Sequence, residues 1–517
     1  MSRLVPLETI RAALERAGQL LGVQGTLPDA VLAITDDSRK IGQRTCFVAV
    51  RGSERDGHSF LPQVEQAGAV CAIVEDAKAT SLPALVVRES RVASAIAAAA
   101  FYGEPAKAMR FIGVTGTNGK TTTVGIVRHL LDSTASPSAS IGTLGVLIGS
   151  EGAMLPGGSG LTTPGPIELQ RILFELRRHG VVTVAMEVSS HALHQQRVLG
   201  VRFDAAVFTN LTRDHLDYHK TMDAYLEAKA LLVGLLTEQG AAVVNAEDPA
   251  WSALPKAPRR VRFAADAADA ADAADAAAGA AVPGTAAVDA EVRARGVRYT
   301  PRGSEWTLET ADGSAAVRLP LIGDFNVSNA LGAAAAALAL GMSVADVAAR
   351  LTTLPQVPGR LEVLHEHPTV LRDYAHTPDA LERACLALRP FTPGRLIVLF
   401  GCGGDRDKGK RPLMALAALK YGDRILVTSD NPRTEDPEAI LDDIVVPLPH
   451  GSYVRIEDRR AAIAHAIALA DPEEDLVLLA GKGHETYQIR GTTSFPFDEK
   501  AIVHDILKQN ASRAEPA

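Results

Sequence analysis

Residues 112–123, IGVTGTNGKTTT, contain a Gly-Lys-Thr triplet of the kind that binds nucleotide phosphates. A Walker A loop places another glycine five positions before the glycine of this triplet, but Val114 occupies that position here. The other glycines of the stretch are Gly113 and Gly116. The stretch is therefore either a phosphate loop of unusual spacing or an ordinary turn between a strand and a helix.

The sequences on either side favour a phosphate site. MRFIGV (109–114) predicts a short buried strand, and TTTVGIVRHLLD (121–132) has apolar residues at helical spacing. A glycine-rich turn between such elements directs backbone N–H groups and the positive end of a helix dipole at one point, which suits an anion. Lys120 adds a positive charge there, and the Thr121 hydroxyl can be a ligand of Mg²⁺.

An acidic residue ends the next apolar run of interest, VVTVAME (181–187). The run predicts a buried strand that ends at Glu187, so the carboxylate projects from the sheet edge where we expect the glycine-rich loop. A Walker B acid has this position and holds Mg²⁺ against the β and γ phosphates of ATP. The alternative is an acid at a strand end that faces solvent.

The following predicted strand, AAVFTN (205–210), leads into a cluster of acids and histidines at the same edge. The cluster consists of Asp214, His215, Asp217 and His219. Its His-x-x-x-His spacing allows a zinc site, but no cysteine or third spaced ligand supports one, and histidines on a helix surface are the simpler interpretation. Farther along, Lys229 lies on a predicted helix with an apolar side, where the pattern alone indicates a surface lysine whose stem covers apolar neighbours.

The composition of the 517-residue chain is that of an ordinary globular protein, with 47% apolar and 22% charged residues. The net charge of −8 gives no basic surface for a nucleic-acid partner, and no apolar run is long enough to insert into a membrane. The N-terminus carries charges throughout and has no apolar signal segment. The four cysteines form no Cys-x-x-Cys pair, which predicts buried thiols in a cytoplasmic protein and neither a disulfide framework nor a zinc site.

The length predicts about three domains, all of the α/β class. Residues 1–106 form a small α/β module in this interpretation, and 107–354 alternate strands with helices, which is typical of a mostly parallel sheet. Residues 355–517 contain a further set of short apolar strands. The three-residue near-repeat AADAADAADAADAAAGAA (264–281) is interpreted as an insertion without chemistry.

Eleven motifs, taken in order, resemble the Mur ligase family. They are GVTGTNGKTTT, TTPGP, MEVSSHAL, FTNLTRDHLDYH, EAKALL, GDFNVSNALGAAAAA, PGRLE, DYAHTPDAL, GCGGDRDKGKRPLM, SDNPRTEDP and AGKGHETYQ. The resemblance runs from about Thr35 to near the C-terminus and is interrupted only by the insertion. It identifies Gly-Thr-Asn-Gly-Lys-Thr-Thr as this family's own form of the phosphate loop.

The resemblance implies three domains: an N-terminal UDP-sugar-binding domain, a central P-loop ATP-binding domain with a parallel sheet, and a C-terminal Rossmann-like domain that binds an amino acid. It implies that ATP phosphorylates a carboxylate and that an amine then displaces phosphate from the acyl phosphate. The implied substrates are ATP, UDP-N-acetylmuramoyl-L-alanyl-D-glutamate and meso-2,6-diaminopimelate, used by a monomer with two Mg²⁺ in peptidoglycan precursor synthesis. An L-lysine-adding ligase and a regulatory ATP-binding module stay open as alternatives, although Glu187, the acid and histidine cluster and the third domain argue against the module.

The resemblance also assigns residues to ATP and metal. The ATP residues are Gly116, Thr117, Asn118, Gly119, Lys120, Thr121 and Thr122 at the phosphates, with Asn326 and Asn329 near the adenine. The implied metal ligands are Thr121, Glu187, His215 and Lys229. Lys229 matches a family lysine that is carbamylated to N6-carboxylysine, which makes a cation into an anionic metal ligand, and it joins Lys120, Glu187 and His215 as catalytic residues.

For the UDP-sugar peptide, the resemblance assigns residues in the first two domains. They are Asp36, Ser38, Ser53, Glu54 and Arg55, followed by Thr162, Thr163, Ser189, Gln195 and Arg197. The family commonly has Asn just before the Thr-Thr pair, where this chain has Leu161. A side-chain contact to the peptide is therefore missing here or is replaced by the backbone.

The residues assigned to diaminopimelate come at or just beyond strand ends in the third domain, which converge on one crevice of a parallel sheet. They are Arg406, Asp430, Asn431, Pro432, Arg433, Gly481 and Glu485. The nearby GCGGDRDKGK (401–410) lacks the spacing of a dinucleotide loop.

Diaminopimelate differs from lysine by a carboxylate, which Arg433 can bind through two parallel hydrogen bonds. Arg406 adds a second cation, and Asp430 and Glu485 can accept from ammonium groups, while Pro432 fixes the turn that presents Arg433. The alternative is that Arg433 caps the following helix or pairs with Glu435.

Overall fold

The computed structural model of the chain describes residues 4–52, 55–156, 160–265 and 289–514. Its residues form two compact units. The first consists of Met1–Phe263, Asp289–Glu291 and Gly332–Ser343, and the second contains Val292–Leu331 and Val344–Ala517. The predicted domain boundaries near residues 106 and 354 stay predictions, and all of the predicted insertion after residue 265 lies outside the described ranges.

The N-terminal part of the first unit is built on a five-stranded sheet with the order β2-β7-β6-β5-β4. The elements are β1 (Val5–Pro6), α1 (Leu7–Arg16), β2 (Leu20–Gln24), β3 (Ala30–Val31), β4 (Ala33–Thr35), β5 (Thr45–Val48), α2 (Leu61–Gln66), β6 (Cys71–Val74), β7 (Ala84–Val87) and α3 (Ser90–Tyr102). Apolar residues of α1 and α3 pack on one face of the sheet and those of α2 on the other. The predicted α/β module is thereby confirmed.

All four cysteines are free and buried, as predicted. Cys46 of β5 and Cys71 of β6 are nevertheless neighbours, because they are partners in the register of these two parallel strands. The hydrogen bond with the Cys71 thiol, together with burial, raises the pKa of the Cys46 thiol, so this thiol stays protonated and apolar in character.

The central part of the first unit is a sheet with the order β11-β10-β9-β12-β8-β13-β14-β15. Its strands are β8 (Arg110–Thr115), β9 (Ser138–Gly142), β10 (Gly145–Ile148), β11 (Ala153–Leu155), β12 (Thr183–Glu187), β13 (Phe203–Phe208), β14 (Leu236–Asn245) and β15 (Arg259–Ala265). The helices are α4 (Lys120–Leu131), α5 (Pro166–Arg178), α6 (Ser190–His194), α7 (Leu216–His219) and α8 (Met222–Ala230). The predicted parallel sheet is confirmed from β9 to β15, whereas β10 and β11 add an antiparallel edge that the sequence did not indicate.

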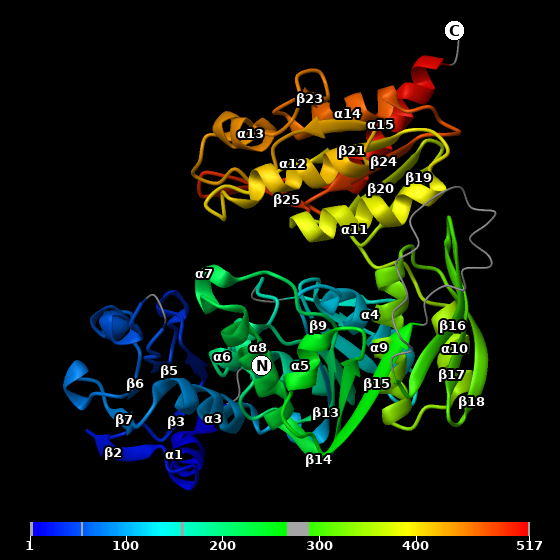
Figure 1. Cartoon of the computed structure of the whole chain (residues 1–517). Coiled ribbons are helices and arrows are strands. Elements are labelled where there is room, and N and C mark those ends of the chain that lie inside the picture. Colours follow the sequence, from blue (N-terminus) through cyan, green and yellow to red (C-terminus); the bar gives the residue numbers. More distant parts are fainter. Residues whose placement is uncertain (1–3, 53–54, 157–159, 266–288, 515–517) are drawn as a thin grey trace. The chain divides into compact units, whose positions relative to one another are not determined.

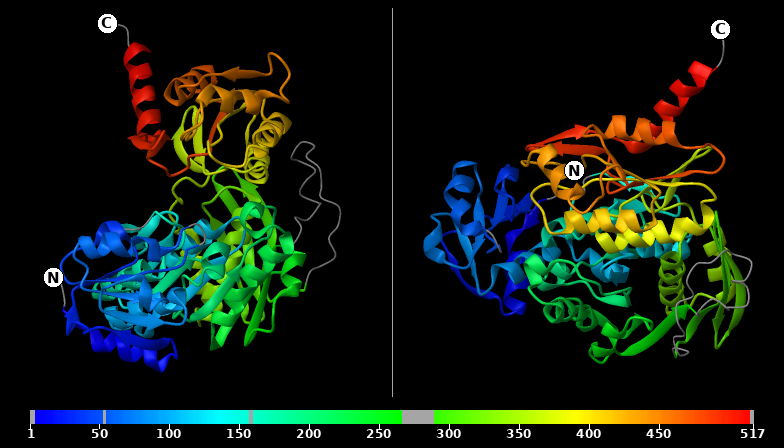
Figure 2. Two further views of the ribbon diagram at one scale, coloured as in Figure 1. Left: turned by 90° about the vertical axis from the view of Figure 1, so that its left-hand side faces the viewer. Right: turned by 45° about the horizontal axis from the view of Figure 1, so that its top comes forward.

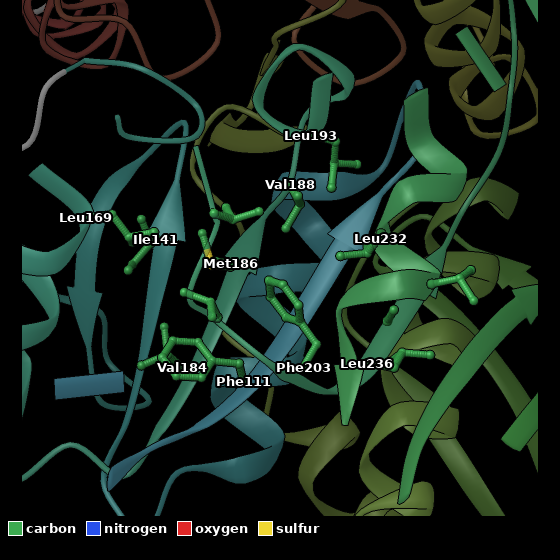
Figure 3. Close-up of a cluster of buried hydrophobic side chains, with 14 of the residues drawn as sticks. Phe111, Ile141, Leu169, Val184, Met186, Val188, Leu193, Phe203, Leu232 and Leu236 are labelled. Atoms are coloured by element: carbon green, nitrogen blue, oxygen red, sulfur yellow. The ribbon is translucent and has the colours of Figure 1, made fainter. Parts of the chain in front are cut away.

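A cluster of buried apolar side chains holds this sheet in place (Figure 3). Val184 and Met186 of β12 belong to it together with Phe111 of β8 and Phe203 of β13. Gly113 leaves room for the Phe203 ring, since a Cβ atom at this position would lie 2.9 Å from the ring. The rigid core fixes the carboxyl ends of β8, β12 and β13, where the predicted site residues begin.

The second unit starts with an antiparallel sheet and two helices. These are β16 (Val292–Thr300), β17 (Gly303–Thr310), β18 (Gly313–Leu319), α9 (Asp324–Ala339) and α10 (Val344–Thr352). Helix α10 packs against β18, and the chain of α9 runs on into the first unit. The sequence did not indicate this antiparallel sheet.

The rest of the second unit is a six-stranded sheet with the order β19-β20-β24-β21-β22-β23, parallel except for β19. Its strands are β19 (Glu362–Glu366), β20 (Thr369–Asp373), β21 (Leu396–Phe400), β22 (Arg424–Val427), β23 (Tyr453–Arg455) and β24 (Leu476–Ala480), and β25 (Tyr487–Arg490) forms a hairpin with β26 (Thr493–Pro496). The helices are α11 (Pro378–Leu388), α12 (Lys410–Tyr421), α13 (Pro437–Val445), α14 (Arg459–Leu469) and α15 (Glu499–Ala514). Helices α11, α12 and α13 pack on one face and α14 and α15 on the other, which confirms the Rossmann-like prediction (Figures 1 and 2).

Among the residues that the structure describes, no helix is long and apolar enough to cross a membrane.

Candidate active site

The glycine-rich loop connects β8 to α4 in the first unit. Val114 lies inside β8 and is buried, so the strand continues through the position where a Walker A loop would have glycine. The turn is instead made by Gly116 and Gly119, whose φ angles are +148° and +85°. A Cβ atom on Gly116 would lie 1.9 Å from the Thr209 hydroxyl, so this position requires glycine for close approach of the two segments.

The segment after β13 supports the loop, a role that no sequence pattern indicated. The side chain of Asn210 accepts from the Asn118 N–H at 2.9 Å and donates to the Asn118 carbonyl at 3.2 Å. The Asn210 carbonyl accepts from the Thr117 N–H at 2.7 Å, and the Thr209 hydroxyl donates to the Asn118 carbonyl at 2.7 Å. The sequence shows that polar residues follow both β8 and β13, but only the structure shows that these two parallel strands are adjacent.

Two lysines meet at the loop. The Lys120 ammonium donates to the carbonyls of Gly116 at 2.9 Å and Thr117 at 2.7 Å, and the Lys229 ammonium donates to the same Gly116 carbonyl at 2.8 Å. Lys229 is 1% exposed, so its interpretation as a surface lysine is wrong. Burial, and then the charge of Lys120, hold the pKa of the Lys229 amine well below its ordinary value.

Glu187 ends β12 inside the protein, with an exposed fraction of 1%, so the solvent-facing alternative is wrong. Its carboxylate accepts from the Thr143 N–H at 2.8 Å and from the Thr143 hydroxyl at 3.2 Å. Within the described part of the chain, no lysine, arginine or histidine forms an ion pair with it. A buried carboxylate without a protein cation is a fitting ligand for a metal ion.

Histidines from two segments gather beside the lysines. His215 has a φ angle of +55° at the start of α7, and burial and the charges of Lys120 and Lys229 lower its pKa. The centroid of the His191 ring lies 4.8 Å from that of the His215 ring and 5.3 Å from that of the His219 ring.

His219 is buried, and its Nε2 atom lies 2.9 Å from the Ser190 hydroxyl, so it is not the surface residue that the simpler interpretation expected. The zinc interpretation gains no support, because the described residues contain no group of three His, Cys, Asp or Glu that could hold a metal ion.

The residues assigned to the UDP-sugar peptide in the central part are brought together. The Thr163 hydroxyl donates to the Glu187 carbonyl at 2.8 Å and accepts from the Ser189 N–H at 3.1 Å. The Arg197 guanidinium donates to the Thr163 carbonyl at 3.1 Å and to the Gln195 side-chain oxygen at 2.7 and 3.0 Å. The Thr162 hydroxyl lies 3.2 Å from the Thr143 hydroxyl, while Leu161 is 48% exposed and packs into no core.

Where the structure describes them, the N-terminal residues assigned to the UDP-sugar peptide are not connected by hydrogen bonds to the central ones. Asp36 and Arg55 are exposed, and Ser38 begins a short 3-10 helix that Asp37 caps. No hydrogen bond among the described residues joins these side chains to the central ones. Ser53 and Glu54 lie outside the described residues.

Asn326 and Asn329 are buried on α9 in the second unit. The Asn326 side chain donates to the Ile322 carbonyl at 2.8 Å, and the Asn329 side chain donates to the Asn326 side-chain oxygen at 3.1 Å. Both amides therefore stabilise the first turn of α9, and their assignment to the adenine stays a prediction.

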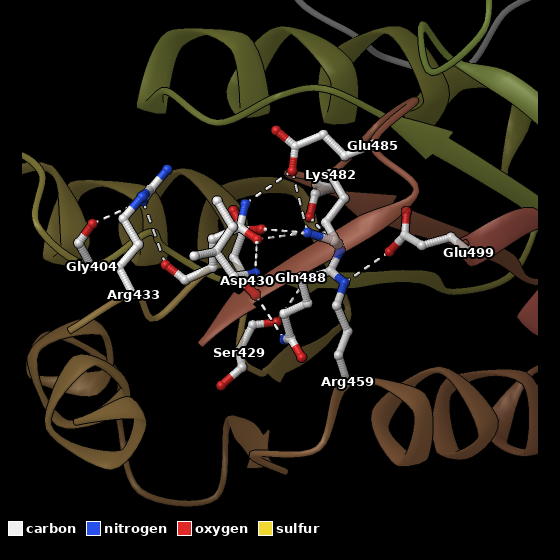
Figure 4. Close-up of polar contacts among 12 residues, drawn as sticks. Gly404, Ser429, Asp430, Arg433, Arg459, Lys482, Glu485, Gln488 and Glu499 are labelled. Carbon is white, nitrogen blue, oxygen red and sulfur yellow. Dashed lines mark hydrogen bonds and ion pairs between the residues drawn. The ribbon is translucent and has the colours of Figure 1, made fainter. Parts of the chain in front are cut away.

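Except for Arg406, the residues assigned to diaminopimelate gather at the carboxyl ends of β22 and β24 (Figure 4). The Asn431 side chain donates to Glu485 Oε2 at 2.9 Å, and the Lys482 ammonium lies 3.2 to 3.3 Å from oxygens of Asp430, Asn431 and Glu485. Burial raises the pKa of the Glu485 carboxyl. Lys482 follows Gly481 directly, and no sequence pattern indicated a role for it. Arg406 is exposed on the loop after β21.

Arg433 is held by backbone contacts. Its φ angle is +51°, and its guanidinium donates to the Gly404 carbonyl at 2.8 Å. Glu435 pairs with Arg411 at 2.9 Å and with Lys408 at 3.1 Å, so the alternative that it pairs with Arg433 is wrong. The cap of α13 is the Asp436 side chain, which excludes the other alternative for Arg433.

Comparisons with known proteins match most of the chain. The profile described as "Mur ligase family, catalytic domain" matches residues 31–112, "Mur ligase middle domain" matches 114–337, and "Mur ligase, glutamate ligase domain" matches 359–483. A UDP-N-acetylmuramoyl-L-alanyl-D-glutamate–2,6-diaminopimelate ligase of Geobacillus thermodenitrificans is 43% identical over 493 residues, which cover 94% of this chain and 96% of that protein. The ligase of the same name from Synechococcus elongatus is 43% identical over 498 residues, 93% of this chain and 95% of that protein. A solved structure with this ligase name has a TM-score of 0.64 and 30% identity, and the match covers 98% of this chain and 100% of that one.

Proposed function

Because the chain belongs to the Mur ligase family, whose members are ATP-dependent acid–amino-acid ligases, we propose that it adds meso-2,6-diaminopimelate to UDP-N-acetylmuramoyl-L-alanyl-D-glutamate. The amine joins the γ-carboxylate of the D-Glu residue, and ATP becomes ADP and phosphate. The relatives that carry this name and match nearly the whole chain support the proposal. The product is a peptidoglycan precursor made in the cytoplasm.

In the first step the substrate carboxylate attacks the γ-phosphorus of ATP, and the bond from that phosphorus to the bridging oxygen breaks. Lys120 and the positive end of α4 neutralise charge on the phosphate oxygens, which is the main protein contribution to phosphoryl transfer. The oxygen donors of Thr121 and Glu187 fit Mg²⁺, and Glu187 has the buried carboxylate that such a cation needs. A bound Mg²⁺ would supply further neutralisation of the phosphate charge.

Lys229 is suited to carbamylation. Carbamylation requires the neutral amine, since nitrogen attacks carbon dioxide, a nitrogen–carbon bond forms and an N–H proton leaves. The lowered pKa of the Lys229 amine favours that form, and the resulting anion would be next to the Lys120 ammonium. His215, whose pKa is also lowered, is neutral at pH 7 and can bind metal through its ring nitrogen.

Thr162, Thr163, Ser189, Gln195 and Arg197 are proposed to hold the UDP-sugar peptide. Their mutual hydrogen bonds connect them to the carbonyl of Glu187, which would bring the D-Glu carboxylate close to the metal ligand. Asp36, Ser38 and Arg55 are proposed to bind the nucleotide-sugar end of the same substrate.

One observation carries the choice of amine. Arg433 is half-buried and, among the described residues, has hydrogen bonds to the carbonyls of Gly404 and Asn431 and no carboxylate partner, although Glu435 is two positions away. A guanidinium held in place without an acid is suited to the far carboxylate of diaminopimelate, which lysine lacks. Lysine would leave this charge unpaired, which favours diaminopimelate over the lysine-adding alternative.

The test is phosphate release from ATP by the purified chain, measured with and without each substrate. The ligase requires the UDP-peptide and the amine together, whereas a regulatory ATP-binding module requires neither. Incorporation of meso-, LL- and DD-diaminopimelate and of L-lysine identifies the amine. Phosphate release that does not depend on the amine, or a preference for lysine over diaminopimelate, would contradict the proposal.

A further inference from the structure

Lys482 is a completely buried lysine for which the ligase reaction described above has no use. It lies just after β24, separated from the strand by Gly481, and its side chain is 0% exposed. Its ammonium lies 3.3 Å from Asp430 Oδ1, 3.2 Å from Asn431 Oδ1 and 3.3 Å from Glu485 Oε2 (Figure 4). Burial of an ammonium costs several kcal/mol unless its partners compensate, so a lysine at this position needs a reason.

All three hydrogen-bond partners of the Lys482 ammonium are side chains assigned to the amine. Asp430 and Asn431 come from the loop after β22, and Glu485 comes from the loop after β24, so the ammonium joins two loops. The Asn431 side chain closes the ring by donating to Glu485 at 2.9 Å. The ring contains two carboxylates and one ammonium, so one negative charge is left for the ammonium group of an incoming amino acid.

The backbone of these loops is held without Lys482. The Gln488 side chain donates to the Asp430 carbonyl at 2.7 Å, and the Gly404 N–H donates to the Asn431 carbonyl at 2.9 Å. The Ile489 N–H also donates to the Asn431 side-chain oxygen at 2.9 Å, so it shares the placement of this one side chain with Lys482. The buried Arg459, paired with Glu499, donates to the carbonyl of Ala480 at 2.9 Å (Figure 4). Lys482 therefore acts on the positions of side chains, and other groups fix the course of the chain.

We propose that Lys482 is a positioning residue for the amine: its ammonium holds the Asp430 and Glu485 carboxylates and the Asn431 amide so that the two carboxylates together accept the substrate ammonium. This inference rests on the proposed function. Without Lys482 the two buried carboxylates repel each other, and Glu485, whose carboxyl pKa is already raised by burial, takes up a proton and stops accepting from the substrate.

The experiment compares Lys482→Met and Lys482→Gln with the wild type. We expect Lys482→Met to raise the KM for diaminopimelate at least about tenfold, because one to two hydrogen bonds between charged groups are lost. The KM for ATP and the KM for the UDP-peptide should stay within about twofold of the wild-type values. Lys482→Gln keeps a hydrogen-bond donor without the charge, so its KM for diaminopimelate should lie in between.

A double-mutant cycle with Glu485→Gln tests whether Lys482 acts through the carboxylate. Once Glu485 is neutral, Lys482→Met should raise the KM for diaminopimelate by much less than it does in the wild type, so the two effects should not multiply. A lysine with a general structural role would give effects that multiply.

Arg395→Met is the matched control. Arg395 pairs with the buried Asp475 at 2.6 Å on the same sheet, but at the amino end of β21, away from the carboxyl-end loops. Its replacement should lower the temperature of unfolding and leave the KM for diaminopimelate unchanged.

An unchanged KM for diaminopimelate in Lys482→Met, multiplying effects in the cycle, or loss of folding in both Lys482 variants would overturn the inference. Wild-type turnover tests the proposed function by itself. A wild type that uses no diamine overturns both, whereas one that uses diaminopimelate with an unchanged KM in the variants overturns the role of Lys482 alone.

Discussion

Replacement of Arg433 by alanine should remove most of the preference for diaminopimelate over lysine. The Arg433 guanidinium has five N–H donors, and Nη1 donates to the Gly404 carbonyl at 2.8 Å. Nε and Nη2 form no hydrogen bond with any residue that the structure describes, so this edge can bind a carboxylate through two parallel bonds.

The size of the effect follows from these two bonds. A single hydrogen bond between charged groups contributes about 1.5–3 kcal/mol. Because Arg433 is half-buried, each of the two bonds should lie near the lower end of this range, so that the two together contribute about 3–4 kcal/mol. Since about 1.4 kcal/mol corresponds to a factor of ten, the ratio of kcat/KM for diaminopimelate to that for lysine should fall roughly a hundredfold to a thousandfold.

The assay measures kcat/KM for both amines at saturating ATP and UDP-peptide, in the wild type, Arg433→Ala and Arg433→Lys. The lysine variant keeps the charge without the planar fork, so it should recover only part of the selectivity. Both variants keep a side chain at the +51° φ angle of this position, so their temperatures of unfolding should be similar. A variant that keeps the full selectivity, or whose KM for ATP rises by the same factor, would refute the reasoning.

Three further predictions concern single groups. Lys120→Ala should fold normally and abolish ligation, because the charge that faces the phosphates is lost; near-normal phosphate release would contradict the ATP site. Lys229→Ala should also lose activity, and a short carboxylic acid such as acetate should restore part of it by replacing the carbamate; full activity without the acid would show that no carbamate is needed. The hydrogen bond from Arg411 lowers the pKa of Glu435 from 4.5 to about 2, so its stabilising contribution is present above pH 4.5 and is lost as the pH falls toward 2. Urea unfolding of Glu435→Gln should therefore show a flatter decline of the unfolding free energy over this pH range than the wild type does.

Sequence patterns predicted the strands that consist of consecutive apolar residues. MRFIGV and VVTVAME became the buried strands β8 and β12, and the short apolar strands predicted in residues 355–517 became β20, β21, β22 and β24. Strands buried on both faces have near-continuous apolar runs, which makes them visible without a structure. The antiparallel β16, β17 and β18 have mixed residues on exposed faces, so no comparable signal marked them.

Positions in sequence also predicted which polar residues end those strands, because the carboxyl ends of parallel strands meet at one edge. Glu187 was located in this way. The family resemblance assigned roles to Asp430 and Arg433, which also follow a strand end, and to Lys229, which the local pattern had interpreted as a surface residue. What a side chain touches depends on segments that are distant along the chain. Lys229 and Gly116 are 113 positions apart, and Lys482 is 52 positions from Asp430. The tertiary structure alone decided the burial of these two ammonium groups, the lowered pKa of the Lys229 amine and the pairing of Lys482 with carboxylates. It also decided the support of the phosphate loop by Asn210, because these contacts arise only when the strands are packed side by side.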